Sequence, residues 1–179
     1  MFNDLLKEFC APLSPDEIEW KIQGVTNNKD KTIIVPYMNN RAVMTRLDNC
    51  FGANNWSAKF THINYQFSKS SKKDGPRVEN GLGTVCELSI KTGNEWITKS
   101  DGADATHIEP FKGGISDAMK RAATQWGMGR DLYDYPKIFL EGAHFYIPPQ
   151  TMSLLNQMVV KKNTQGLEKD VVVLPNPNK

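Results

Sequence analysis

The chain has 179 residues, a formal net charge of +2 and three cysteines. A domain of this size buries about 70% of the surface of its unfolded chain, so it can form a core without disulfides. Cys10, Cys50 and Cys86 are widely spaced, lack a CxxC motif and lie far from the three histidines. We therefore expect neither a disulfide framework nor a zinc site, and no other metal or cofactor.

The N-terminal ten residues are too acidic for a signal peptide, and no stretch of about 18 apolar residues follows. These features predict a soluble protein without a membrane partner.

Charge is unevenly distributed along this nearly neutral chain. Five acids and one base lie between Asp4 and Glu19, whereas the segments Lys69–Arg77 and Lys112–Arg130 each hold four bases and one acid. Local basic segments on a near-neutral protein favour a directed anion site over general polycation binding.

The N-terminal third predicts two helices around a hairpin. Apolar spacing indicates a helix from Phe2 to Phe9, and the segments 18–25 and 31–38 read as a β-hairpin. Asn39 or Asn40 would cap a helix ending near Phe51. Arg41 lies in its first turn, where a cation opposes the helix dipole at a cost of about 0.3 to 1 kcal/mol. Either the side chain extends into solvent or it meets an anion.

Three antiparallel strands are predicted next. Residues 56–67 alternate, and a change of parity near His62 indicates a bulge or a strong twist. Residues 68–81 are expected to form a basic hairpin loop, 82–90 and 96–100 further strands, and 101–114 a loop. Three tryptophans of this region and the next helix are expected in the core: Trp56, Trp96 and Trp126.

The segment 113–134 predicts one helix with two different faces. Ile115, Met119, Ala122, Ala123 and Trp126 cluster on the apolar face at 100° per residue. The opposite face carries Asp117, Lys120, Arg121 and Thr124. Asp117 can offset only part of one charge, so positive charge is expected to remain for an external anion. Gly127 and Gly129 read as a helix end and chain reversal.

The C-terminal segment contains weaker signals. Residues 144–149 (HFYIPP) resemble a short strand, 151–160 a small helix, and 171–174 (VVVL) a short strand. These features predict one domain over residues 1–148 and a C-terminal helix and tail over 149–179.

Catalytic motifs are scarce. There is no GxxxxGK[ST] phosphate loop and no recognisable nucleophile elbow. A Mg²⁺-dependent nuclease using Asp101, Asp104 and Glu109, or Glu19 with Lys21, is an alternative, although acidic surface loops are common. We therefore expect a protein that is not an enzyme, in which aromatic residues such as Tyr65 stack on bases.

The segments NNRAVMTRLDNCFGANNW and ISDAMKRAATQWGMGRDLYD, joined by a three-strand meander, resemble the Rad52 family of single-strand annealing proteins. The resemblance runs from about Ile18 to Tyr135 and points to the bacterial and phage branch that includes DNA damage response protein A. It implies an α+β fold with a β-β-β-α core. An antiparallel sheet would pack on a long helix, with an added N-terminal β-hairpin and short flanking helices.

The resemblance also implies a homo-oligomeric closed ring that carries single-stranded DNA in a basic groove. The expected DNA-binding residues are Arg41, Lys120 and Arg121, followed by Thr124, Arg130, Tyr65, Lys69, Lys72 and Lys73. The expected function is ATP-independent annealing in recombination and repair, in the cytoplasm of a bacterium or a phage-infected cell, with a single-strand binding protein as a further candidate partner. End protection without annealing and a purely structural interaction domain are the remaining alternatives.

Overall fold

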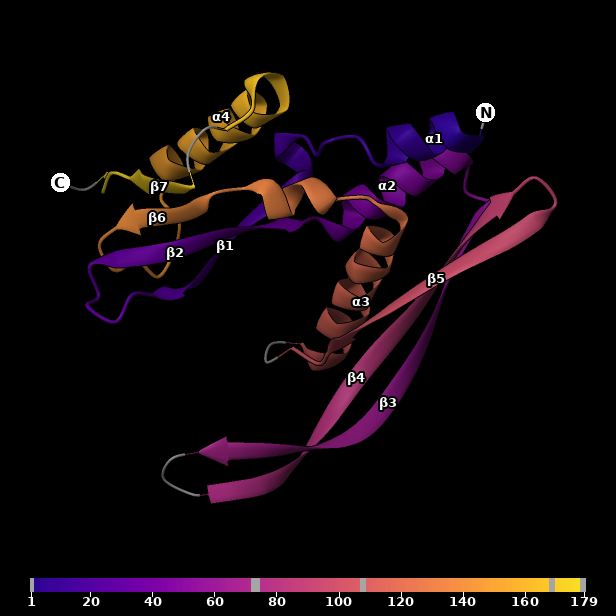
Figure 1. The fold of residues 1–179 in the computed structure, drawn as a ribbon, viewed down its shortest axis with the longest axis horizontal. Coiled ribbons are helices and arrows are strands. Elements are labelled where there is room, and N and C mark those ends of the chain that lie inside the picture. The colour runs from indigo at the N-terminus through magenta and orange to yellow at the C-terminus, as the bar shows by residue number, and fades with distance from the viewer. Residues whose placement is uncertain (1, 72–74, 107–108, 168–169, 178–179) are drawn as a thin grey trace. The chain divides into compact units, whose positions relative to one another are not determined.

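The computed structural model describes residues 2–71, 75–106, 109–167 and 170–177. The described chain is a mixed α+β structure with two separate sheets. It divides into two units (Figure 1): Met1–Cys10 with Val43–Met128, and Ala11–Ala42 with Gly129–Lys179. None of the described helices combines the length and the apolar run needed to cross a bilayer.

The sheet of the first unit is an antiparallel meander in the order β3-β4-β5. Its strands are β3 (Trp56–Ser71), β4 (Gly75–Thr92) and β5 (Glu95–Asp104). Alternation in β4 buries Thr84, Cys86, Leu88 and Ile90 on one face, whereas Leu82, expected on the same face, is 38% exposed. The expected three-strand meander is therefore confirmed.

Three details of this meander differ from the prediction. The β3–β4 register continues without a shift from the Trp56–Ile90 pair to the Ser71–Gly75 pair, so there is no bulge at His62. The described flanks of the expected basic loop are strand, because cross-strand pairs continue the ladder into this polar segment. Residues 101–104, expected in a loop, form the end of β5.

Helix α3 (Pro110–Trp126) packs against β4 and β5, with β5 giving the larger contact. Met119, Ala122, Ala123 and Trp126 are buried, and the indole N–H of Trp126 donates to the carbonyl of Leu88 at 3.1 Å. This arrangement confirms the predicted β-β-β-α core and the apolar face of the helix.

The predicted helix over 113–134 is two elements. α3 ends at Gly127, whose φ of 114° lies in the left-handed region that favours glycine. After the reversal, residues Arg130–Asp134 form the 3₁₀ helix η2. The two glycines thus interrupt the helical run, consistent with the predicted helix end and chain reversal.

Two short helices complete the first unit. α1 (Phe2–Phe9) packs Phe9 against Phe51 with ring centroids 5.5 Å apart. α2 (Asn40–Phe51) contributes residues from Val43 onward to this unit and ends at Gly52, where φ is 86°. Both helices agree with the sequence prediction.

Of the three tryptophans expected in the core, Trp126 is buried, Trp56 is half-buried, and Trp96 is 49% exposed because it lies on the sheet face opposite the helix.

The second unit contains a sheet in the order β1-β2-β6-β7. The predicted hairpin is confirmed as β1 (Ile18–Val25) and β2 (Lys31–Met38), preceded by the 3₁₀ helix η1 (Pro15–Glu17). β6 (Lys137–Glu141) pairs with β2 in antiparallel orientation, and β7 (Val171–Leu174) pairs with β6 in parallel orientation. Residues 144–149, expected to form a strand, are not part of one. The strand of this region is β6, which comes earlier in the chain.

Helix α4 (Pro149–Gln165) connects β6 to β7. It buries Thr151, Leu155 and Val159, a stripe at four-residue spacing. The predicted helix over 151–160 is confirmed and is longer at both ends. A parallel β6–β7 pair requires a long crossover connection, and α4 supplies it.

Candidate nucleic-acid interface

Lys120 and Arg121 lie next to each other on the polar face of α3. Their side chains differ in exposure, since 12% of Lys120 and 56% of Arg121 remains accessible. Helix packing on the sheet therefore leaves Arg121 as the more accessible of the two cations.

Both cations have carboxylate partners, and the partner of Arg121, Asp101, is an anion outside the helix, which meets part of the charge expected to remain. The Lys120 amine lies 2.7 Å from Asp117 Oδ1, and Arg121 Nη2 lies 3.0 Å from Asp101 Oδ1. The spacing of residues along α3 does not predict Asp101 as a partner, because Asp101 belongs to β5.

Asp101 is the centre of a hydrogen-bond cluster between β5 and α3. Its Oδ1 accepts the Arg121 Nε–H at 3.0 Å and the backbone N–H of Gly102 at 2.7 Å, while Oδ2 accepts from Gln125 Nε2 at 2.8 Å. Burial raises the pKa of Asp101, but the hydrogen bonds from Gln125, Gly102 and Arg121, with the charge of Arg121, outweigh it, so the pKa lies below its ordinary value. The carboxylate is ionised at neutral pH and fixes one side of the guanidinium.

Lys99 is a further cation at this junction that the sequence analysis did not select. Its amine donates to the carbonyl of Gln125 at 3.0 Å and lies 4.7 Å from the centre of the Trp126 ring. Lys99 and Asp101 share one face of β5, because side chains two residues apart in a strand point the same way. The two-residue spacing of Lys99 and Asp101 is visible in the sequence, but it places them on one face only if residues 101–104 belong to the strand.

Thr124 lies on the same polar face, one turn beyond Lys120. Its hydroxyl donates to the carbonyl of Lys120 at 3.0 Å, a bond within the helix. A threonine hydroxyl carries no charge, so Thr124 is a polar neighbour of the two cations.

The β3–β4 hairpin carries the second group of predicted residues. Lys69 and Arg77 both pair with Glu79, at 3.3 Å and 2.6 Å. Lys72 and Lys73, also predicted, lie outside the described residues. Glu79 therefore offsets part of the positive charge on the described part of the hairpin.

Tyr65 lies on the face of the sheet opposite α3. Its hydroxyl donates to Asp104 Oδ1 at 2.5 Å, and this hydrogen bond is the main cause that raises the tyrosine pKa. A Cβ built on Gly81 would lie 2.5 Å from Cζ of the Tyr65 ring, so the ring covers the glycine on the paired strand. The ring of Phe67 follows, with its centroid 5.8 Å away. Tyr65 thus has a structural contact on one side of its ring.

Arg41 and Arg130 belong to the second unit. Arg41 is exposed in the first turn of α2, where its backbone N–H donates to Asn39 Oδ1 at 2.8 Å, and its side chain forms no ion pair with any residue the structure describes. Arg130 is exposed at the start of η2. The use of these arginines together with α3 remains a prediction.

The carboxylates of the nuclease alternative have separate partners. Asp101 and Asp104 point to opposite faces of β5, toward α3 and toward Tyr65 respectively. Glu109 pairs with Lys112 at 2.9 Å. Within the described ranges, no group of three or more His, Cys, Asp or Glu side chains is arranged to hold a metal ion.

Comparisons with known proteins identify relatives of this chain. The chain is 28% identical over 137 residues to the single-stranded DNA-binding protein DdrA of Deinococcus radiodurans, and 29% identical over 136 residues to that of Deinococcus deserti. Each alignment covers 75% of this chain, and it covers 57% and 59% of those relatives. It is also 28% identical over 124 residues to the DNA repair and recombination protein rad22 of Schizosaccharomyces pombe, covering 64% of this chain and 26% of the yeast protein.

The chain therefore spans less than two thirds of the length of each of these relatives. The sequence profile of the Rad52/22 family of double-strand break repair proteins matches residues 1–147, which include both polar clusters described above. This match covers most of the chain, and it agrees with the resemblance carried by the two helical segments. The chain belongs to the Rad52/22 family of double-strand break repair proteins.

Proposed function

We propose that this protein binds single-stranded DNA and anneals complementary strands without nucleotide or metal, as a homo-oligomer. The observation that carries the proposal is the exposed guanidinium of Arg121 beside Lys120 on α3. Curated relatives that share this region are named single-stranded DNA-binding proteins, which supports DNA as the anion.

Asp101 occupies only one side of that guanidinium. Two N–H groups of Arg121 point to Asp101 Oδ1, and an arginine side chain has five donors in a planar fork. The remaining N–H groups can donate to a phosphate oxygen while the Asp101 contact persists. A phosphate bound there would gain charge-assisted hydrogen bonds but would also meet the negative charge of Asp101.

Binding through phosphates leaves the bases available for pairing. Contacts to the backbone position a strand without reading its sequence, and exposed bases can then pair with a second strand. Base pairing supplies the free energy of annealing in this scheme, so no hydrolysis step is needed. Tyr65 is proposed to stack on a base with the side of its ring that faces away from Gly81.

Repetition of the site is needed for affinity. Each subunit offers few cations, and most are partly neutralised by acids, whereas subunits side by side make each later contact with the strand intramolecular. The outer edges of β3 and β5 pair with no other strand among the described residues, and Trp96 and Ile97 on β5 are 49% and 40% exposed. Open edges with exposed apolar side chains are typical of surfaces that pair with another chain, which supports an assembly such as a ring.

The activity can be tested with two complementary oligonucleotides, one carrying a fluorophore and the other a quencher. We expect the full chain to accelerate quenching in EDTA without nucleotide. Strand binding without accelerated quenching would instead indicate end protection, and shortening of the strands that appears only with Mg²⁺ would indicate a nuclease. No binding at any salt concentration would favour a structural interaction domain.

A further inference from the structure

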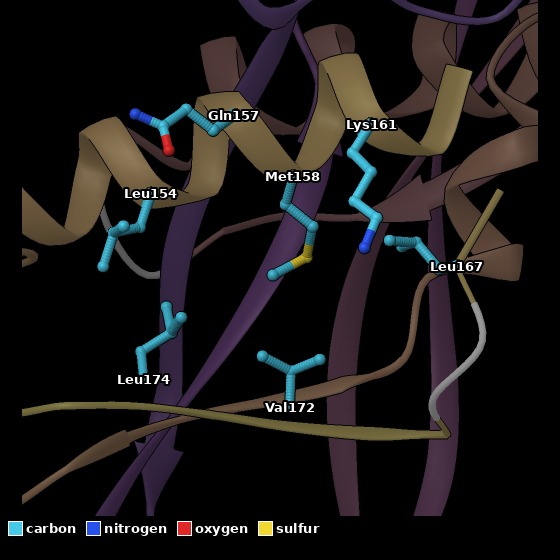
Figure 2. A pocket seen from close by; sticks show the side chains of 7 residues that line it. All are labelled: Leu154, Gln157, Met158, Lys161, Leu167, Val172 and Leu174. Atoms are coloured by element: carbon cyan, nitrogen blue, oxygen red, sulfur yellow. The ribbon is translucent and has the colours of Figure 1, made fainter. Parts of the chain in front are cut away.

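The second unit contains an apolar groove between α4 and β7, and none of its described lining residues is among those assigned to DNA (Figure 2). It encloses about 320 Å³, near the lower limit of the range of about 300 to 1,000 Å³ for ligand sites. Its lining residues are Leu154, Gln157, Met158, Lys161, Leu167, Val172 and Leu174.

The groove side of α4 is a second stripe, distinct from the core stripe. Leu154, Met158 and Lys161 lie about 100° around the helix from Leu155, Val159 and Lys162. Leu155 and Val159 are fully buried, whereas Leu154 is 38% exposed. The helix thus offers an accessible apolar surface in addition to the one that it buries.

The floor of the groove is the edge strand of the sheet. β7 pairs with β6 on one side and with no other strand in the described ranges on the other. Val172 and Leu174 point into the groove, while the alternate side chains of Val171 and Val173 are 47% and 46% exposed. The free edge of β7 therefore presents backbone N–H and C=O groups directly beside the apolar groove.

The groove also has a charge at one end. Figure 2 shows the Lys161 amine directed toward Leu167, at the opposite end from Leu154 and Leu174. Lys161 has no ion pair with any residue that the structure describes, and α4 contains no Asp or Glu. Lys162, by comparison, is bound to Asp131 at 3.5 Å. Among the described residues no carboxylate pairs with Lys161, so an anion would complement this end of the groove.

We propose that β7 and this groove bind an extended peptide of a partner protein by strand addition. The peptide would pair with the edge of β7, place one apolar side chain against Met158 and Leu174, and place one carboxylate at Lys161. Both side chains must point toward α4, so they must be two residues apart in the peptide. Since Lys161 lies beside the beginning of β7, an antiparallel peptide has the order apolar-x-acid and a parallel peptide the reverse.

This inference is independent of the proposed DNA site, and it can be tested by fluorescence polarisation with labelled peptides. The probes are Ser-Thr-Leu-Thr-Glu-Thr-Ser and its reversed pattern Ser-Thr-Glu-Thr-Leu-Thr-Ser. The matched control, Ser-Thr-Leu-Glu-Thr-Thr-Ser, has the same composition but places Leu and Glu on opposite faces of a strand. We expect one probe to bind the full chain below about 1 mM and the control to bind at least about fivefold more weakly.

Two variants and a control variant locate the site. We expect Leu154→Ser and Lys161→Gln each to weaken probe binding about fivefold, and Lys91→Gln, a charge change on the exposed end of β4, to leave it unchanged. Replacing Glu by Gln in the probe should remove the effect of Lys161→Gln. Equal binding of probe and control, or no binding up to about 1 mM, would overturn the proposal. A change in oligomer mass caused by Leu154→Ser would also overturn it, because the groove would then be a contact between copies of the chain.

Discussion

Arg121 and Asp101 form a contact between α3 and β5 in which two guanidinium N–H groups point to one carboxylate oxygen, with Nε and Nη2 each 3.0 Å from Oδ1. The same carboxylate accepts hydrogen bonds from Gln125 and Gly102. The proposed DNA site therefore contains an acid at its centre, and this acid both orients the arginine and opposes the phosphate.

Removing the charge of Asp101 separates these two roles. In Asp101→Asn the side chain keeps its shape and one acceptor oxygen, which can still accept from Arg121 and Gly102, while the negative charge beside Arg121 disappears. We expect single-stranded DNA to bind several-fold more tightly, with the slope of log affinity against log salt steeper by up to about 0.7, the value for one additional phosphate contact. Polarisation with labelled oligothymidine at several salt concentrations measures both quantities. Weaker binding by this variant would show that orientation of Arg121 matters more than repulsion.

Asp101 should also give a pH dependence to stability. Its pKa in the folded chain lies below that of an unfolded aspartate, about 3.9. The ionised carboxylate therefore stabilises the fold above that pH, and this contribution is lost as the pH falls through the folded pKa. We expect the difference in unfolding free energy between the natural chain and Asp101→Asn to be largest near pH 7 and to shrink toward pH 3. Urea denaturation at both pH values measures it, and a difference that grows toward low pH would contradict the assigned ion pair.

Tyr65 can be tested for base stacking apart from its cover of Gly81. Tyr65→Phe keeps the ring and loses only the hydrogen bond to Asp104, so strand affinity should stay within about twofold. Tyr65→Leu keeps an apolar cover over the glycine but has no aromatic face, and it should lose about 1 to 3 kcal/mol for each stacked base. Affinity measurements on the two variants decide the point. If the leucine variant binds DNA as well as the phenylalanine variant, Tyr65 serves the sheet alone.

The cysteines test the packing of the first unit. Burial, and secondarily the charge of Glu87, raises the pKa of the Cys86 thiol to about 11, and burial also raises that of Cys50. Cys10 is less buried, with its thiol donating to the carbonyl of Trp126 at 3.3 Å. Because the thiolate is the reactive form, we expect iodoacetamide at pH 8 to add at most one label to the native chain and three to the unfolded chain. Intact mass spectrometry counts the labels, and rapid labelling of Cys86 in the native chain would contradict the packing of β4 on α3.

The sequence predicts the fold where the apolar residues of one element form the face that packs on another element. The apolar face of α3 follows from the spacing of Met119, Ala122 and Trp126, and the buried face of β4 follows from alternation around Cys86 and Leu88. Sequence alone failed where a neighbouring strand decides the structure. Residues 101–104 are strand because β4 pairs with them, and the short β6 forms because β2 and β7 flank it.

The candidate site was predictable in the same limited sense. Helical spacing places Lys120, Arg121 and Thr124 on one face, and the structure agrees. Asp101 and Lys99 were not recognised as their neighbours, since their positions depend on how β5 packs on α3. The helical pattern therefore predicts the cations of α3 but not the ion pairs that they form with residues of another element.

The central claim is that Lys120 and Arg121 hold the phosphates of a single strand. The most direct measurement is annealing of complementary labelled strands by the variant with Lys120→Gln and Arg121→Gln, in which glutamine can keep hydrogen bonds to Asp117 and Asp101. The control variant, with Lys7→Gln and Lys91→Gln, removes the same charge from exposed positions elsewhere in the first unit. We predict that the first variant loses strand binding and annealing while its circular dichroism and oligomer mass stay unchanged, and that the control remains active. Annealing by the first variant at the rate of the natural chain would contradict the account.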